Sequence, residues 1–258
     1  MTPNVIGRVL EFAAMTSRLP QIVIKEIVRR VDSGITEPIL CKSENEIAYC
    51  IKGRQALNSG KVAEVISAVV GRKIGLPIPN FAVSNFSSGL IEFSREIPEI
   101  SLIGLEPGFA STWIEPVDYF SLGFSGKFPD SLLASIFIFD RWIMNGDRTL
   151  TEHGGNVNLL VNLSEQKLVL IDHNLAFSKS FFDDDPRLHV GYSAWMGLDG
   201  KAQFVLSLRS KMEEAISAIS HIDRDLPSEW LEADPSLAEN ALRALNRARY
   251  DEFWDELP

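Results

Sequence analysis

The chain has 258 residues, with 25 Lys and Arg against 35 Asp and Glu, so its formal charge is −10. This length suffices for one large domain or two lobes around a sizeable core. A net negative charge repels a phosphate backbone, which excludes nucleic-acid binding through a broad basic face. The N-terminus shows no signal-peptide pattern, and the richest apolar run, 132–139, is too short to span a membrane. We therefore expect a cytoplasmic protein that binds neither nucleic acid nor a membrane.

The two cysteines match no metal-binding or redox spacing. If residues 44–47 form the turn of a β-hairpin, Cys41 and Cys50 face each other on neighbouring strands. In a cytosolic chain we interpret them as reduced thiols packed in a small sheet.

The first half of the chain predicts a small β-rich region with one helix. Short strands are expected over 39–42 and 47–52, and another over 81–83. Between them, apolar residues over 62–74 recur at helical spacing, and a turn rich in Gly and Pro ends that helix. The segment 101–113 contains two glycines and a proline, and we expect it to carry the crossing into the second half.

The second half is predicted to be mainly helical. Residues 131–145 are apolar almost all round, which is typical of a central, buried helix. Apolar residues over 205–219 form an amphipathic stripe, and a last helix is expected from 237 to about 253. Two short apolar strands, 159–161 and 168–171, predict a hairpin between these helices. The predicted fold class is therefore α+β.

The polar segment after the central helix is where acids, amides and short strands combine into a candidate site. Asp147 follows the buried helix, and Asp172 closes the predicted hairpin. A turn centred near residue 165 pairs Asn158 with Asp172, with Cβ atoms about 5 Å apart. An amide and a carboxylate at that spacing suit one hard cation. Magnesium-dependent phosphoryl transfer needs such a layout, with a separate acid near the attacking hydroxyl.

Each of these residues also has a purely structural interpretation. Asp147 could cap the turn after the helix, and Asp172 could simply end a strand. Lys52 alone would be an ordinary lysine at the end of a strand. Their joint occurrence with Asn158, in the order found in kinases, favours a site.

Five segments together carry a resemblance to a known family: 49–52, 62–65, 75–79, 145–148 and 226–230. They resemble the HipA-like kinases, a bacterial branch of the protein-kinase-like and phosphatidylinositol-kinase-like superfamily. The resemblance is to the compact HipA-like domain and runs over most of the chain. It implies a two-lobed protein-kinase-like fold over 1–258. A small β-rich lobe with one helix is then expected at about 20–110, and a larger, mostly helical lobe at about 114–258.

The same resemblance implies a role for each candidate residue. Lys52 is expected to hold the α- and β-phosphates of ATP, and Glu64 to pair with it. Asp147 becomes the catalytic base, while Asn158 and Asp172 bind Mg²⁺. The implied enzyme is a serine/threonine kinase that transfers the γ-phosphoryl group of ATP to a protein hydroxyl. Its implied partners are a protein substrate and, as a possibility, a toxin–antitoxin-like partner.

Three features depart from the family pattern, and one of them is that His173 and Asn174 follow Asp172 where ordinary protein kinases have Phe and Gly. The stretch 149–155 lengthens the loop after Asp147, so Asn156 competes with Asn158 as the amide ligand, and we prefer Asn158 because of the hairpin pairing. The segment 32–38 lies where a phosphate-covering loop belongs but contains one glycine.

Other polar residues near the site have less specific expectations. Glu64 points away from the apolar stripe of its helix, toward small residues that allow close approach, so it faces either the cleft or solvent. His173 replaces the Phe that follows the metal-binding Asp in ordinary protein kinases, and we expect it to support the site by hydrogen bonding. Arg148 is expected to stabilise the catalytic loop. His153 is expected at the surface, and 183–185 as a solvated acidic loop or a contact for a basic substrate.

Three alternatives stay open at the level of sequence. The acceptor could be a small molecule or a lipid headgroup, the chain could be a catalytically silent nucleotide-binding module, or AMP could be transferred instead of phosphate. Two features support the alternative of a catalytically silent module, namely the long loop after Asp147 and the single glycine of 32–38.

Overall fold

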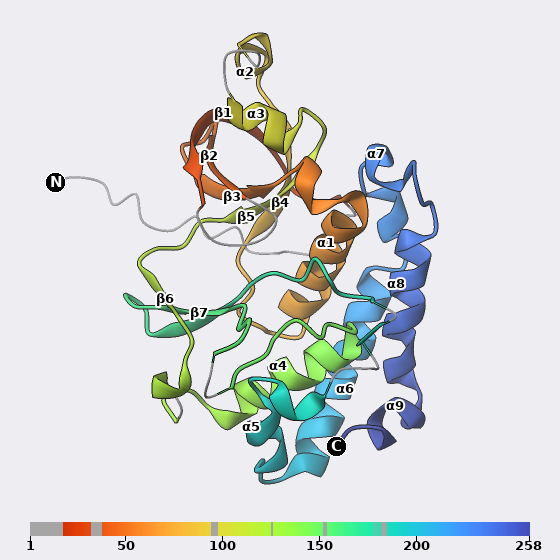
Figure 1. Ribbon diagram of the computed structural model, residues 1–258. Helices are drawn as coiled ribbons and strands as arrows, with labels where there is room; N and C mark the ends of the chain where they lie inside the picture. The colour runs from red at the N-terminus through yellow and green to blue at the C-terminus, as the bar shows by residue number, and fades with distance from the viewer. Residues whose placement is uncertain are drawn as a thin grey trace, which may run out of the picture.

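The computed structural model describes residues 18–31, 38–93, 98–124, 126–151, 154–178, 180–181 and 185–258 (Figure 1). Over these residues the protein is α+β, with a β-rich N-terminal part and a helical C-terminal part, as the sequence predicts. The expectations for 32–37, His153 and 183–184 lie outside the described residues. Within the described part of the chain, no helix has the length and apolar character that a membrane span requires.

Five of the described strands close into a barrel in the order β1-β2-β3-β5-β4. They are β1 (Gln21–Arg30), β2 (Ile39–Ser43), β3 (Ala48–Lys52), β4 (Phe81–Phe86) and β5 (Gly108–Thr112). β-Branched and aromatic residues recur in them, and alternate side chains such as Ile24, Ile51 and Ala110 fill a core inside the barrel. Lys52 is the last residue of β3 and pairs with Phe109 of β5.

The chain leaves the barrel later than the sequence predicts. Gly108 lies inside the predicted crossing, but it begins β5, where a Cβ atom would meet Ser84 Oγ at 2.8 Å and the Lys52 carbonyl at 3.1 Å. This glycine therefore marks a close approach between strands and not a linker. The crossing follows Thr112 and contains the cis Glu115–Pro116 peptide bond.

Helix α1 (Asn58–Lys73) confirms the helix predicted over 62–74 and lies between the barrel and the C-terminal helices (Figure 1). It is buried without interruption from Gly60 to Gly71. It packs against α6 (Lys201–Ala218), α7 (Ser228–Leu231) and α8 (Leu237–Asn246). Its apolar residues thus belong to the core of the C-terminal part, although α1 follows β3 in the chain.

Helix α4 (Asp130–Trp142) is the predicted central helix, and its residues from Ile136 to Phe139 are fully buried.

The helix predicted over 237–253 is not continuous in the structure. Helix α8 ends at Asn246, and α9 (Asp251–Asp255) starts after Tyr250, which has an extended backbone. At the break, Trp142 and Trp254 donate side-chain hydrogen bonds to carbonyls at the end of α8 and just beyond it, at 2.8 Å each. The remaining named elements are α2 (Ser88–Glu92), α3 (Pro98–Ile103), α5 (Tyr192–Met196), β6 (Val117–Tyr119), β7 (Leu159–Asn162) and β8 (Lys167–Leu170).

Strands β7 and β8 form the predicted hairpin, but its register differs by one residue from the expectation. Leu159 pairs with Leu170, so Asn158 lies across from Ile171 and not from Asp172. The reason is the turn, where Gln166 adopts a left-handed backbone (φ 53°) and the Asn162 side chain accepts hydrogen bonds from two turn N–H groups. Such a left-handed residue changes the loop length and with it the pairing.

The hairpin of β2 and β3 shows the same one-residue difference. Cys41 pairs with Tyr49, and Cys50 pairs with Leu40, so the two cysteines are not directly opposite. Glu46, with φ 62°, ends the turn in the left-handed region. Both thiols are free, and burial raises the pKa of Cys41 to about 12 and that of Cys50 to about 11. These thiols are therefore protonated and unreactive at neutral pH, as the interpretation of packed, reduced cysteines requires.

Candidate active site

Three residues from distant parts of the chain meet at the edge of the barrel. Lys52 Nζ donates to Glu64 Oε1 and to Asp172 Oδ1, at 2.5 Å each. Lys52 and Glu64 are buried, whereas the side chain of Asp172 keeps 25% of its surface exposed. Glu64 therefore faces Lys52 and not solvent, because small residues on its side of α1 let that helix be buried all round.

The charges of these three residues support one another. Burial alone would lower the pKa of the Lys52 ammonium, but the carboxylates of Glu64 and Asp172 outweigh it and raise that pKa. Burial alone would raise the pKa of Glu64, but the charge of Lys52 holds it below its usual range. At neutral pH the site therefore contains a fixed ammonium group between two carboxylates.

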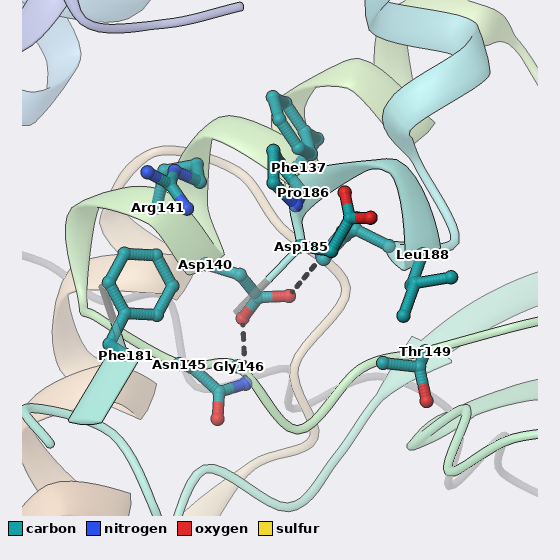
Figure 2. Close-up of a pocket in the computed structure, with 11 residues that line it drawn as sticks. Phe137, Asp140, Arg141, Asn145, Gly146, Thr149, Phe181, Asp185, Pro186 and Leu188 are labelled. Atoms are coloured by element: carbon teal, nitrogen blue, oxygen red, sulfur yellow. Dashed lines mark hydrogen bonds and ion pairs between the residues drawn. The ribbon is translucent and has the colours of Figure 1, made fainter. Parts of the chain in front are cut away.

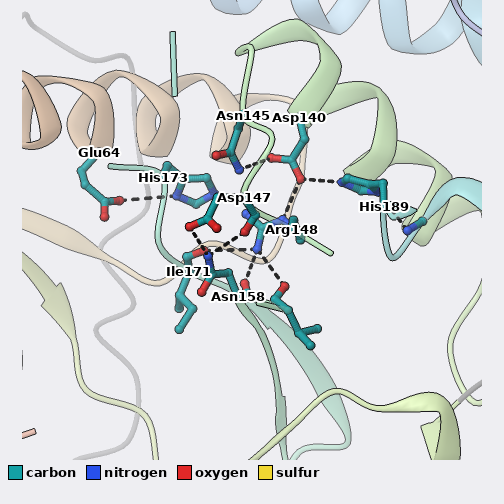
Figure 3. Close-up of polar contacts among 11 residues, drawn as sticks. Glu64, Asp140, Asn145, Asp147, Arg148, Asn158, Ile171, His173 and His189 are labelled. Atoms are coloured by element: carbon teal, nitrogen blue, oxygen red, sulfur yellow. Dashed lines mark hydrogen bonds and ion pairs between the residues drawn. The ribbon is translucent and has the colours of Figure 1, made fainter. Parts of the chain in front are cut away.

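His173 reaches the same group from the other side of Glu64. Its Nδ1 lies 3.5 Å from Glu64 Oε2, and its ring packs edge-on against Phe139 at 5.8 Å between centroids (Figure 3). This is the supporting position expected for His173. Glu64 is thus held by Lys52 through one oxygen and approached by His173 at the other.

Asp147 lies beside this group and is held by both candidate amides. Asn156 Nδ2 donates to Asp147 Oδ1 at 2.7 Å. Asn158 Nδ2 donates to the Asp147 carbonyl at 2.9 Å and to its Oδ2 at 3.2 Å (Figure 3). Burial raises the pKa of Asp147, the Asn156 hydrogen bond opposes this, and the charge of Asp172 adds to the increase. The two carboxylates lie in one site because Asn158, which donates to Asp147, accepts a backbone hydrogen bond from Ile171, the neighbour of Asp172.

The backbone explains how Asn158 and Asp172 reach this site despite the shifted register. Asn158 has φ 43° and Asp172 has φ 58°, so each adopts a left-handed conformation at the base of the hairpin. Asn and Asp tolerate this region better than most residues. The predicted direct pairing is wrong, but both residues lie at the open end of the β7–β8 ladder, close to Asp147.

Arg148 fixes the backbone around the site, as expected from the sequence. Its NH1 group donates to the carbonyls of Asn158 and Ile171, the latter at 3.2 Å. Its Nε donates to Asp140 Oδ2 at 2.6 Å, and both side chains are almost fully buried. Arg148 thereby joins the loop after α4 to both sides of the hairpin.

Asp140 is the residue that the sequence analysis missed. Its carboxylate also accepts from Asn145 at 3.0 Å and contacts His189 Nε2 at 2.8 Å. Burial alone would raise the pKa of Asp140, but Arg148 and His189 hold it well below its usual range. The available signal was an acid inside the apolar run of α4, since a buried acid requires a partner.

A small cavity of about 70 Å³ lies beside the loop that follows α4, against Asn145, Gly146, Phe181 and residues within 185–189 (Figure 2). Ligand pockets for nucleotide-sized molecules are several times larger, about 300–1,000 Å³. This cavity is lined by neither Lys52 nor Asp172. It is therefore not the candidate nucleotide site.

The oxygen atoms of the site suit an Mg²⁺ ion that is shared with a substrate, and not a metal ion that protein side chains hold alone. Among the described residues there is no group of three or more His, Cys, Asp or Glu side chains arranged to hold a metal ion. Mg²⁺ characteristically takes one or two carboxylates together with substrate phosphates. Asp172 offers a partly exposed carboxylate, and Asn158 donates through its amide nitrogen, which leaves its amide oxygen for a cation.

Comparisons with known proteins identify the family and the fold of the chain. A family model described as HipA-like kinase matches residues 24–257. The structure is similar to the crystal structure of the Helicobacter pylori proinflammatory kinase CtkA, with a TM-score of 0.54 and 13% identity over 89% of this chain and 94% of that chain. It is also similar to the Golgi casein kinase, with a TM-score of 0.45 and 14% identity over 93% of this chain and 75% of that one. No curated protein matches the chain.

Proposed function

Because the chain belongs to the HipA-like kinase family, we propose that it transfers the γ-phosphoryl group of ATP to a protein Ser or Thr hydroxyl with the help of Mg²⁺. The family match and the kinase-like fold support a phosphotransferase. We propose that the β-rich and helical parts act as two lobes with the nucleotide between them. The observation that carries this proposal is the contact of Lys52 with both Glu64 and Asp172, beside Asp147.

Lys52 binds the phosphates of ATP in this proposal. Its ammonium group is held at the end of β3 by Glu64, and the raised pKa of Lys52 keeps it charged at any physiological pH. Asp172 and Asn158 would hold the metal, which would neutralise charge on the phosphate oxygens. Glu64 is almost fully buried, so its role is to fix Lys52 and not to touch substrate.

Asp147 orients the acceptor hydroxyl and takes its proton late in an in-line displacement. Asn156 and Asn158 hold its carboxylate by one hydrogen bond to each oxygen, which fixes its orientation. Burial raises the pKa of Asp147, which makes it a better proton acceptor than an exposed Asp. Arg148 holds the backbone on which Asn158 lies.

Incubation with ATP labelled at the γ-phosphate, Mg²⁺ and a protein acceptor tests this function directly. We expect label on Ser or Thr, with Asp147→Ala and Asp172→Ala losing transfer while their thermal unfolding stays cooperative. A parallel reaction with ATP labelled at the α-phosphate reports AMP transfer. Equal γ-label transfer by all three proteins, or transfer of the α-label alone, would contradict the proposal.

A further inference from the structure

Helix α7 in the C-terminal part is bonded to both elements that flank the Lys52–Glu64 pair. The carbonyl of Pro107 accepts a hydrogen bond from Trp230 Nε1 at 2.8 Å and a longer one from Lys61 Nζ at 3.4 Å. The Lys61 ammonium group also lies 5.3 Å from the centroid of the Trp230 ring. The Asn58 side chain donates to the carbonyl of Glu229 at 2.9 Å. We call these five residues the Trp230 junction.

The centre of the Trp230 junction, Trp230 with Lys61, is buried and includes a charge that is costly to bury. Trp230 is fully buried and Lys61 is 3% exposed. Burial lowers the pKa of the Lys61 ammonium, although the charges of Glu106 and Glu229 oppose this. A cation in the first turn of a helix is also unfavourable to the helix dipole. General packing would favour an apolar residue here, so the lysine indicates a specific requirement for this contact.

Residues of the Trp230 junction lie close in the chain to the neighbours of both Lys52 and Glu64. Pro107 directly precedes β5, whose Phe109 pairs with Lys52 across the strands. Lys61 lies three residues before Glu64 on α1, which places both on adjacent turns of one helix face. Figure 1 shows α7 against the end of α1 that is nearest the barrel. A single tryptophan therefore ties the strand next to Lys52 to the helix turn next to Glu64.

We propose that Trp230 is a positioning residue for the Lys52–Glu64 pair. By joining the start of β5 to the first turn of α1, it holds the two side chains at contact distance. The packing of α1 against α6, α7 and α8 serves the same end, since it fixes the helix within the C-terminal core. The inference rests on the proposed role of Lys52 in binding ATP, and it assigns to the C-terminal helices the task of keeping that lysine in place.

Trp230→Phe tests the inference, because it keeps the aromatic volume and removes the indole N–H. Trp254→Phe is the matched control, since Trp254 Nε1 also donates to a backbone carbonyl at 2.8 Å, that of Ala248, away from α1. We expect Trp230→Phe to weaken binding of a fluorescent ATP analogue with Mg²⁺ about fivefold to tenfold, the value of one buried hydrogen bond. Trp254→Phe should leave this affinity within about twofold. Equal weakening by both variants would overturn the inference.

A double-mutant cycle separates positioning from general stability. If Trp230 acts through the pair, Trp230→Phe adds no further loss of nucleotide affinity to a Glu64→Gln protein. Additive losses would show that Trp230 acts elsewhere and would overturn the inference.

Hydrogen exchange tests the junction without nucleotide and so separates its failure from failure of the proposed function. We expect Trp230→Phe, but not Trp254→Phe, to speed the exchange of amides in the first turns of α1. Unchanged exchange there would overturn the inference. A native protein that does not bind the ATP analogue would instead contradict the proposed function.

Discussion

Two polar clusters in this protein bury carboxylates beside a cation, yet they differ in what remains open. The closed cluster contains Asp140, Asn145, Arg148 and His189. Both carboxylate oxygens of Asp140 contact protein groups, and its side chain is 1% exposed. The open cluster contains Lys52, Glu64, Asp147 and Asp172, and in it the Asp172 side chain keeps 25% of its surface exposed.

The difference teaches which carboxylates can act on a ligand. A carboxylate with partners at both oxygens and no exposed surface serves the fold, because a ligand could reach it only by breaking buried bonds. A partly exposed carboxylate beside a buried lysine can accept a cation with little rearrangement. The buried carboxylates of Asp140 and Glu64 both have a pKa held low by a neighbouring cation, whereas burial raises the pKa of the partly exposed Asp147.

The largest effect is expected in the open cluster, on catalysis. Asp147→Asn should lower the rate of phosphoryl transfer by roughly a hundredfold to ten-thousandfold, because the proton acceptor is lost. Its free energy of unfolding should stay within about 1 kcal/mol of the native value, since an amide replaces a half-buried acid with a raised pKa. Transfer assays and urea unfolding check both statements. A large loss of stability would place Asp147 with the closed cluster.

In the closed cluster the main effect should be on stability. Asp140→Asn leaves Arg148 buried without its counter-charge, so the free energy of unfolding should fall by about 3–5 kcal/mol. Urea unfolding monitored by tryptophan fluorescence measures this. A loss below about 1 kcal/mol, together with abolished transfer, would mean that Asp140 acts in the chemistry instead.

Substitutions of the two amides beside the open cluster, Asn156 and Asn158, should have different effects. Asn158→Ala should weaken Mn²⁺ binding in the presence of ADP by about tenfold or more, because it removes an oxygen ligand. Asn156→Ala should leave Mn²⁺ affinity unchanged, because the substitution removes no metal ligand. It should lower the transfer rate, because the Asp147 carboxylate loses the hydrogen bond from Asn156 that orients it. Titration followed by electron paramagnetic resonance reports the metal directly. If only Asn156→Ala weakened Mn²⁺ binding, Asn156 and not Asn158 would be the metal ligand.

The smallest effect is a pH dependence of stability. The pKa of Asp140 is lower in the folded protein than its value of about 3.9 in an unfolded chain. Its contribution is therefore present above about pH 4 and is lost as the pH falls further, toward the folded pKa. Between pH 5 and pH 3 the native protein should lose more stability than Asp140→Asn. Parallel losses would contradict the assignment of Asp140 as an ionised partner of Arg148.

Helices α1, α4 and α6 and the order of the site residues were accessible from the sequence, whereas the break between α8 and α9 was not. The apolar spacing over 62–74 predicts α1, and Lys52, Asp147 and Asp172 stand in the order that a kinase requires. These features are local or depend on the order of motifs along the chain. Hydrophobic periodicity and motif order are the strongest signals that a single sequence offers.

The strand registers and the partners of buried charges were not accessible. A single left-handed residue in each turn, Glu46 or Gln166, shifts the pairing by one, and neither is a Gly or an Asn that would signal it. The contact of Asp140 with His189 joins residues far apart in the chain and depends on the packing of the whole C-terminal part. Gly108 suggested a linker because its close approach to β4 exists only in the closed barrel.

A crystal structure with Mn²⁺ and a non-hydrolysable ATP analogue tests the central claim most directly. The anomalous signal of manganese locates the metal independently of the protein coordinates. We predict a Mn²⁺ ion bound by Asp172 and by the amide oxygen of Asn158, with phosphates within hydrogen-bonding distance of Lys52 and the γ-phosphate facing Asp147. A metal at the Asp140 cluster, or a nucleotide that does not contact Lys52, would contradict the account.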